Sequence, residues 1–319
     1  MNGHALMDRR MVRVAAAVTV LAASVVWNVD LAAAEYSEEQ ILSESEETAL
    51  RNDQFGSSVA LSGDGDTAIV GIREYPNLAS PGNDNQGSAM VFTRSGGTWT
   101  EQQTLTLPNG DENDQFGEGV ALSADGDTAI VSAPAAHFDD GQRGPVTVFT
   151  RSGGTWTVQQ ILKPQYPAKH GHSVALSANG DTVIIGSTGT AGASVWTRSG
   201  GTWTQQQVLE EGPDDDGDAF GDRVALSADG NTALVGGKED SANEPGQGSA
   251  TVFTLAGGTW IRQQKIYQSD GTAGDRFGIS LALSADGDTA IVGAHTSDPG
   301  GNDRHGSVTV FTRSGGTWT

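Results

Sequence analysis

Carboxylates are the residues of this chain best suited to chemistry, and many of them gather in short polar runs. The sequence holds 40 acidic residues against 18 basic ones and has a net charge of −22. Such runs can hold a cation, attract a basic partner, or supply the paired carboxylates of a glycoside hydrolase. No pair is singled out by its spacing, so hydrolysis stays an alternative. The acidic positions are 83–85, 111–114, 139–140, 214–216, 239–240, Asp298 and Asp303.

Histidine offers a weaker metal hypothesis. His170 and His172 lie two residues apart, and His295 and His305 belong to one loop that also carries two aspartates. Neither set has the ligand spacing of a zinc site on a helix or hairpin. We interpret His170 as a core residue and the second set as a chance grouping.

Other catalytic groups are missing from the sequence. The chain has no cysteine, which excludes disulfides, thiol catalysis and thiolate metal sites. It contains no Gly-x-Ser-x-Gly elbow, no His-Glu-x-x-His helix and no phosphate-binding loop. The negative charge argues against nucleic acid and anionic membranes as partners. We therefore expect a protein that is not an enzyme and requires no cofactor.

The elements that position these side chains recur along the chain. A Thr-Trp pair closes five similar units, and its tryptophans are 57, 47, 57 and 58 residues apart. Self-similarity at this period is typical of propellers, solenoids and arrays. We place the repeats at about 51–105, 112–162, 169–209, 216–266 and 273–319.

The second repeat shows what one unit builds. An Asp-Gly turn at 125–126 separates two alternating apolar runs, which is a strong hairpin signal. A β-branched run at 146–150 and a Gly-Gly turn at 153–154 then lead into a last strand at 155–162. Four strands per repeat predict an all-β fold, a β-propeller of four-stranded antiparallel blades.

Aromatic side chains occupy fixed places in each repeat, and we interpret them as wedges between neighbouring sheets. An aromatic residue in such a place buries about 150–250 Å². A phenylalanine before a glycine opens the repeat, and the tryptophan of the Thr-Trp pair stands near its end. These structural residues are Phe55, Phe116, Phe220, Phe277, Trp99, Trp156, Trp203, Trp260 and Trp318.

Residues 1–34 have the order of a secretory signal peptide. Arg9, Arg10 and Arg13 precede an apolar run at 14–27, and three alanines at 32–34 offer a cleavage site. The apolar run is shorter than the roughly 20 residues that span a bilayer. We expect export to the periplasm, cell surface or medium, and no membrane span after cleavage.

The repeat resembles a known family. The Phe-Gly pairs at 116–117 and 277–278, followed by apolar runs at 129–133 and 291–294, are similar to the FG-GAP repeat. That repeat builds the β-propeller of integrin α subunits and of many exported microbial proteins. The resemblance begins near residue 36 and implies a propeller, usually of seven blades, used for adhesion or ligand display. The third unit departs from the pattern, because His170 replaces the phenylalanine.

The number of blades stays open. Residues 36–42 parallel residues 156–162, so we interpret them as a closing strand that completes the last blade of a propeller spanning 35–319. Closure would hide the sheet edges that invite aggregation. This reading gives a five-bladed ring. The competing reading is a part of a seven-bladed ring, that is, a fragment of a larger surface protein.

Calcium is the sharpest ligand hypothesis that the resemblance implies. Integrin-type repeats bind calcium through acidic residues at positions 1, 3, 5 and 9 of a loop between their first two strands. That loop is too short here, so we interpret Asp125, Asp229 and Asp286 as turn residues. The spacing returns once, between two repeats, at Asp214, Asp216, Asp218 and Asp222.

The loops predict where a partner would bind. In a propeller, the loops between the second and third strands and the loops between blades emerge at one end of the blades, and here they carry the acidic runs. Variable loops on a rigid scaffold are a common way to build a binding face. We expect an adhesion or interaction module that binds a protein or glycan there. The alternative is a carbohydrate-active or otherwise hydrolytic propeller.

Overall fold

A computed structural model of the chain describes residues 39–43, 54–74, 86–137, 143–163, 169–188, 192–212, 219–297 and 305–319. Residues Gln40–Thr319 form one compact unit. The predicted signal peptide and residues 36–38 of the predicted closing strand lie outside the described residues. Among the described residues, no helix is long and apolar enough to cross a membrane.

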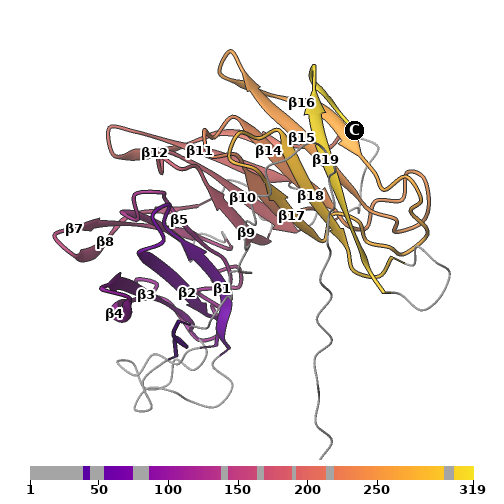
Figure 1. Cartoon of the computed structure of the whole chain (residues 1–319). Coiled ribbons are helices and arrows are strands. Elements are labelled where there is room, and N and C mark those ends of the chain that lie inside the picture. The colour runs from indigo at the N-terminus through magenta and orange to yellow at the C-terminus, as the bar shows by residue number, and fades with distance from the viewer. Residues whose placement is uncertain are drawn as a thin grey trace, which may run out of the picture. The chain divides into compact units, whose positions relative to one another are not determined.

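Five four-stranded antiparallel sheets make up the larger unit, and each is built from consecutive strands (Figure 1). This confirms the predicted all-β propeller architecture, and the sheets are called blades 1 to 5. Blade 1 comprises β1 (Phe55–Leu61), β2 (Thr67–Ile72), β3 (Ser88–Ser95) and β4 (Thr98–Leu105). Blade 2 comprises β5 (Val120–Leu122), β6 (Thr128–Ser132), β7 (Val146–Ser152) and β8 (Thr155–Leu162).

The remaining three blades follow the same order. Blade 3 comprises β9 (Lys169–Leu176), β10 (Thr182–Thr188), β11 (Ala193–Ser199) and β12 (Thr202–Leu209). Blade 4 comprises β13 (Phe220–Leu226), β14 (Thr232–Gly237), β15 (Ser249–Ala256) and β16 (Thr259–Ile266). Blade 5 comprises β17 (Ser280–Leu283), β18 (Thr289–Ala294), β19 (Ser307–Ser314) and β20 (Thr317–Trp318).

Turn chemistry explains why each repeat folds into hairpins. In blade 2, the Thr128 amide donates to the Ser123 hydroxyl at 2.9 Å, and the Asp127 amide donates to the Asp125 carboxylate at 3.0 Å. Gly126 has a φ of 71°, in the left-handed region that suits glycine. The turn between β7 and β8 uses two glycines with positive φ in the same way. These local bonds fix the register of both hairpins.

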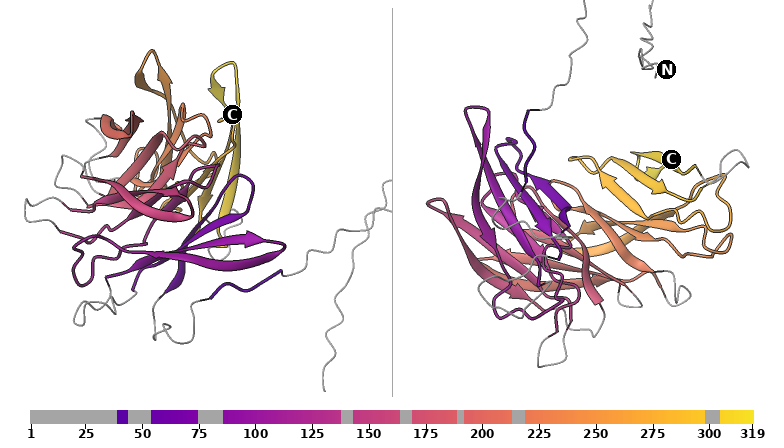
Figure 2. Two further views of the ribbon diagram at one scale, coloured as in Figure 1. Left: turned by 90° about the vertical axis from the view of Figure 1, so that its left-hand side faces the viewer. Right: turned by 90° about the horizontal axis from the view of Figure 1, so that it is seen from below.

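Consecutive blades pack face to face, and each joint has its own apolar cluster (Figure 2). Between blades 1 and 2, Phe116 and Trp156 lie with Ile69 and Val91, all four of them almost fully buried. Phe220 with Trp260, and Phe277 with Trp318, belong to the corresponding clusters farther along the chain. The core is therefore divided among the joints.

The first and last blades differ from the others because one face of each is open. Val59 and Leu61 of blade 1 are 70% and 60% exposed, and Val308 and Val310 of blade 5 are 65% and 57% exposed. The described residues therefore do not close into a ring, and the blade count stays a prediction.

The described part of the predicted closing strand lies on blade 1. The Gln40 side chain donates to the Trp99 carbonyl oxygen at 3.1 Å and accepts from the Trp99 amide at 2.9 Å. Leu42 packs in the cluster that contains Phe55 and Trp99. Pairing of this segment with the last blade is not seen among the described residues.

Candidate functional site

The two ends of the blades have different chemistry, beginning with the turn end. The turns between first and second strands carry acidic residues whose oxygens already accept hydrogen bonds. The Asp64 carboxylate accepts from the Ser62 hydroxyl and from the Asp66 amide, and these bonds lower the pKa of Asp64. Asp125, Asp229 and Asp286 make the equivalent contacts, as expected of turn residues. These carboxylates support turns and do not form a ligand site.

Arginines neutralise a second row of acids at the turn end. Arg151 Nε lies 2.8 Å from Asp127 Oδ1, and its guanidinium stands 5.3 Å from the centre of the Trp156 ring. The same cluster of arginine, aspartate and tryptophan occurs in blades 1, 3 and 5. Blade 4 has Leu255 and Asn231 in place of the charged pair, and the Leu255 amide keeps the backbone bond to Asn231. Both charges are absent from this blade.

At the loop end, the described acids fall into three groups: acids paired with arginine, exposed acids and buried acids. Glu118 lies 3.2 Å from Arg73, and Glu239 lies 3.5 Å from Arg276. Asp111 and Glu112 are exposed, and no ion pair among the described residues involves them. Asp114 is buried and accepts from the Asp111 amide at 2.6 Å. Burial raises the pKa of Asp114. The acidic positions 83–85, 139–140, 214–216, 298 and 303 lie outside the described residues.

A buried ion cluster lies behind this end at the joint between blades 3 and 4. Lys265 Nζ lies 2.8 Å from Glu211 Oε1 and 2.5 Å from Asp240 Oδ2, and both carboxylates are almost fully buried. Burial alone would lower the pKa of Lys265, but its bonds to Asp240 and Glu211 outweigh burial and raise it. Asp240, one of the predicted acidic loop residues, is therefore structural.

Of the four predicted calcium ligands, only Asp222 lies in the described part of the chain. Asp214, Asp216 and Asp218 lie outside the described residues. Asp222 lies on β13 with its side chain 7% exposed, and Lys238 Nζ is 2.9 Å from its carboxylate. In the described part of the chain, no three His, Asp or Glu side chains gather as a metal site would require. The calcium site stays a prediction.

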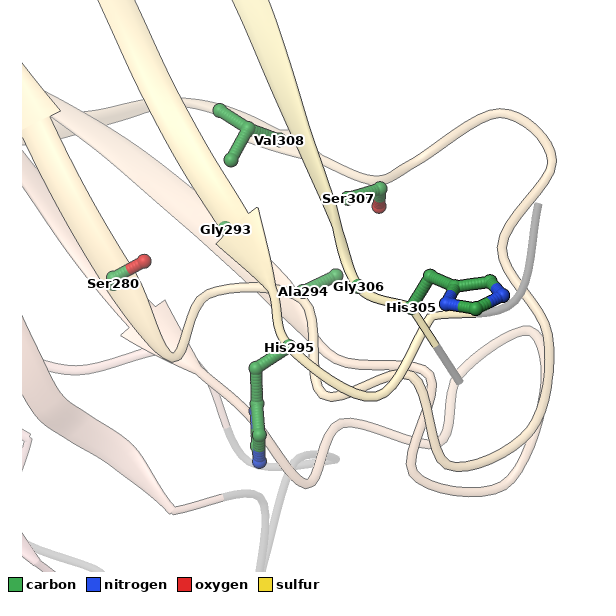
Figure 3. A pocket seen from close by; sticks show the side chains of 8 residues that line it. All are labelled: Ser280, Gly293, Ala294, His295, His305, Gly306, Ser307 and Val308. Carbon is green, nitrogen blue, oxygen red and sulfur yellow. The ribbon is translucent and has the colours of Figure 1, made fainter. Parts of the chain in front are cut away.

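The histidines also have distinct surroundings. His170 is 2% exposed on β9, at the joint between blades 2 and 3, where its main chain packs against Gly144. His295 and His305 lie at opposite sides of a shallow pocket on blade 5, and their rings point in different directions (Figure 3). The pocket encloses about 440 Å³ and is lined by Ser280, Gly293, Ala294, His295, His305, Gly306, Ser307 and Val308.

A close backbone contact explains the glycines at each joint. The carbonyl oxygen of Gly117, which follows Phe116, lies against Gly71 in the preceding blade. A Cβ built on Gly71 would stand 2.0 Å from that oxygen, so any larger residue must displace backbone. The same contact joins Gly186 to Gly221 and Gly236 to Gly278. At the joint between blades 2 and 3, Ser132 replaces the glycine of the second strand.

These joints show the physical role of the Phe-Gly pair, and a family model agrees with them. The FG-GAP repeat matches residues 36–92, 99–149, 203–253 and 260–311. The chain belongs to the FG-GAP repeat family. The last three matched segments each run from the fourth strand of one blade to the third strand of the next, and the first segment ends in β3. The part left unmatched includes His170, where the FG-GAP pattern is broken.

Comparisons with other proteins place the fold but no activity. A protein of unknown function from Desulfotomaculum acetoxidans DSM 771 is 14% identical, with 83% of this chain and 68% of that chain covered and a TM-score of 0.55. Hydrazine synthase of Kuenenia stuttgartiensis is 15% identical, with 86% and 68% covered and a TM-score of 0.52. Among curated proteins, no sequence matches the chain. These likenesses show a shared fold alone.

Two features were missed by reading the sequence. One is the glutamine of the fourth strand, which binds the backbone of the next blade's tryptophan, as Gln160 does with Trp203. The other is the pocket on blade 5. Aligning the repeats position by position would have shown both, because the glutamine recurs in β4, β8, β12 and β16 and the pocket residues have counterparts in the earlier blades.

Proposed function

We propose that this FG-GAP protein is an exported, non-enzymatic interaction module that binds a basic protein or glycan partner at the loop end of its blades. The observation that supports this most is the exposure of two loop-end acids that pair with no basic side chain among the described residues. Acids at the turn end accept internal hydrogen bonds or pair with arginines, as Asp64 and Asp127 do. Asp111 and Glu112 at the loop end face solvent. Exposed like charges on a rigid scaffold attract a partner of opposite charge.

The pocket favours binding over hydrolysis. A glycoside hydrolase needs two carboxyl groups about 5–9 Å apart at its substrate cleft. No carboxylate lines the described pocket, whose polar side chains are those of Ser280, Ser307 and two histidines. Buried acids such as Glu211 and Asp240 are bound to Lys265.

The experiment is a binding titration with a cationic probe. Oligolysine peptide is titrated into the purified protein by calorimetry at low and at high salt, with heparin as the anionic comparison. We expect oligolysine to bind at low salt and to weaken as salt screens the charges, and we expect no heparin binding. Equal binding of both probes, or salt-independent binding, would count against the proposal.

Matched variants locate the binding surface. Changing Asp111 and Glu112 to Asn and Gln removes two exposed charges from the loop end and should weaken oligolysine binding severalfold. The control is Glu101→Gln together with Asp66→Asn, which removes two charges elsewhere, one of them paired with Arg94 at 2.9 Å. If the control weakens binding as much as the loop variant, the attraction is general and the loop end is not a site.

Calcium at the loop end is a separate proposal with its own test. A cation that binds only the folded protein raises its melting temperature. Thermal unfolding in millimolar calcium against EDTA should show a shift of several degrees. The double change of Asp216 and Asp218 to Ala should abolish it. An identical melt in both buffers would leave the loop end without a calcium site.

A further inference from the structure

The pocket of blade 5 corresponds position by position to a contact surface that every earlier blade uses. In blade 1, Gly71, Gly87 and Ser88 surround the Phe116-Gly117 pair of blade 2. The strand pairing aligns these residues with three that line the pocket. They are Gly293, Gly306 and Ser307. The pocket therefore has the shape of a joint that lacks its incoming Phe-Gly pair.

Hydrogen-bonding groups in the pocket match this interpretation. At the closed joint, the Ser58 hydroxyl donates to the Gly117 carbonyl oxygen at 2.8 Å, and the Phe116 amide donates to the Gln86 carbonyl oxygen at 2.9 Å. Ser280 and His305 occupy the corresponding positions of blade 5. The pocket thus offers a donor for an incoming glycine carbonyl and an acceptor for an incoming phenylalanine amide.

The face of blade 5 around the pocket also carries the apolar residues that a closed joint buries. Ile130, Val146 and Val148 of blade 2 are fully buried against blade 3. Their counterparts in blade 5 remain open to solvent. These are Ile291, Val308 and Val310, with exposures of 43%, 65% and 57%. An exposed apolar patch with a defined pocket is typical of an interaction site.

Blade 1 carries the complementary half. A Cβ on Gly117 would meet backbone at 2.1 Å, but a Cβ on Gly56 would meet nothing within 4 Å. Val120 is 8% exposed at the closed joint, whereas Val59, its counterpart in blade 1, is 70% exposed. Among the described residues, no preceding blade receives the Phe55-Gly56 pair.

The segment that contains Gln40 adds an outer strand to this half. Gln40 binds the Trp99 backbone as Gln160 of blade 2 binds that of Trp203, so it occupies the fourth-strand position of a blade before blade 1. In blade 5, β20 pairs with β19 only near Arg313 and Ser314. The edge of β19 beside Val308 and Val310 therefore has no partner strand among the described residues.

We propose that the pocket of blade 5 receives the Phe55-Gly56 pair of a second copy of this chain, so that copies associate head to tail. Residues 40–42 of the incoming copy then lie along the free edge of β19. By the register of blade 2, Gln40 faces Val310. This interface continues the four joints within the chain, which use the equivalent positions. Each chain carries both halves, and among its described residues the two do not meet. Such an interface is heterologous, so both halves remain usable after one contact forms.

The test measures mass by light scattering and analytical ultracentrifugation on the purified protein across the micromolar range. Leu61→Asp damages the exposed face of blade 1 that carries Phe55, Gly56 and Val59, here called the display face. Val310→Asp damages the exposed face of blade 5 around the pocket, here called the pocket face. Leu61 is 60% exposed and Val310 is 57% exposed, so each variant should fold. A thermal melt of each variant checks this. We expect the unchanged protein to associate and each variant alone to be monomeric.

Mixing the two variants gives the deciding measurement. Leu61→Asp keeps an intact pocket face and Val310→Asp keeps an intact display face, so the mixture should form a one-to-one complex and nothing larger. A monomeric mixture overturns the proposal. A monomeric unchanged protein also overturns the proposal. This holds even where hydrogen exchange shows that the two faces are protected by closure within one chain or by another partner.

This association is independent of the proposed loop-end binding. The Asp111 and Glu112 variant should self-associate like the unchanged protein, because neither residue belongs to the two faces. In the unchanged protein, oligolysine binding without association, or association without oligolysine binding, would show which of the two proposals has failed.

Discussion

The closed joint between blades 2 and 3 and the open face of blade 5 are built from nearly the same residues in two different settings. Val148 is fully buried in the first, and Val310 is 57% exposed in the second. Both valines follow the same β-branched pattern on a third strand, so the sequence alone does not distinguish them. The difference teaches that a propeller repeat specifies a surface, and only its neighbour decides whether that surface becomes core.

The largest expected effect comes from placing a charge in both settings. Val148→Asp buries a carboxylate with no partner and should cost more than about 4 kcal/mol of unfolding free energy. Val310→Asp should change the stability of the monomer by less than about 0.5 kcal/mol, because its side chain faces water. Urea unfolding at low protein concentration measures both. Equal losses would mean that the face of blade 5 is covered within the chain.

The next effect concerns the glycine contact. Gly71→Ala forces Cβ against the Gly117 carbonyl oxygen and should cost about 1–3 kcal/mol, since backbone must move. In Gly293→Ala the new Cβ meets only the Ser280 hydroxyl, which can rotate away. We expect that variant to be neutral or more stable by up to about 1 kcal/mol. A large loss at Gly293 would show that the pocket is already occupied.

A smaller difference is expected for the glutamine that links consecutive blades. Gln160→Ala leaves the Trp203 amide and carbonyl without their side-chain partner in a half-buried joint and should cost about 1–2 kcal/mol. Gln40→Ala should cost less than about 0.5 kcal/mol, since water can replace an exposed bond. Denaturation midpoints of the two variants against the unchanged protein give the comparison. A reversed order would contradict the structure.

The smallest effect is a pH dependence at the entrance of a closed joint. Burial raises the pKa of Asp114 in the folded state, so its contribution to stability is full below the unfolded pKa and is lost as pH rises through the folded pKa. Asp114→Asn should therefore be more stable than the unchanged protein at pH 7, by less than about 1 kcal/mol. The advantage should vanish near pH 4. An advantage that grows toward acid pH would be the wrong sign.

Much of this architecture could be predicted from the sequence because its signals are local. The Asp125-Gly126 turn and the alternating run at 146–150 fix a hairpin and a strand without reference to distant residues. The role of the aromatic residues could also be predicted. Equivalents of Phe116 and Trp156 recur at fixed places in the repeats, and these two residues lie at a joint. Family membership followed from the same recurrence.

The site could be predicted only in part, for physical reasons. Asp240 belongs to an acidic run, yet Lys265, 25 positions away, draws it into a buried ion cluster. Asp222 is likewise paired with Lys238. A carboxylate faces solvent or not according to the basic side chains that the fold places beside it. The spacing of residues along the chain does not show which side chains those are. Exposure of Val308 is decided in the same nonlocal way.

The division of the core among the joints has a mechanical consequence. Four apolar clusters each lie between two blades that are consecutive in the chain, a fifth lies on blade 1, and the described residues hold no centre shared by all five blades. A pull on the last strand therefore loads one joint at a time, as in other repeat arrays whose units contact only their neighbours. Under tension we expect the blades to unfold one at a time. The remaining blades stay folded until the next joint breaks.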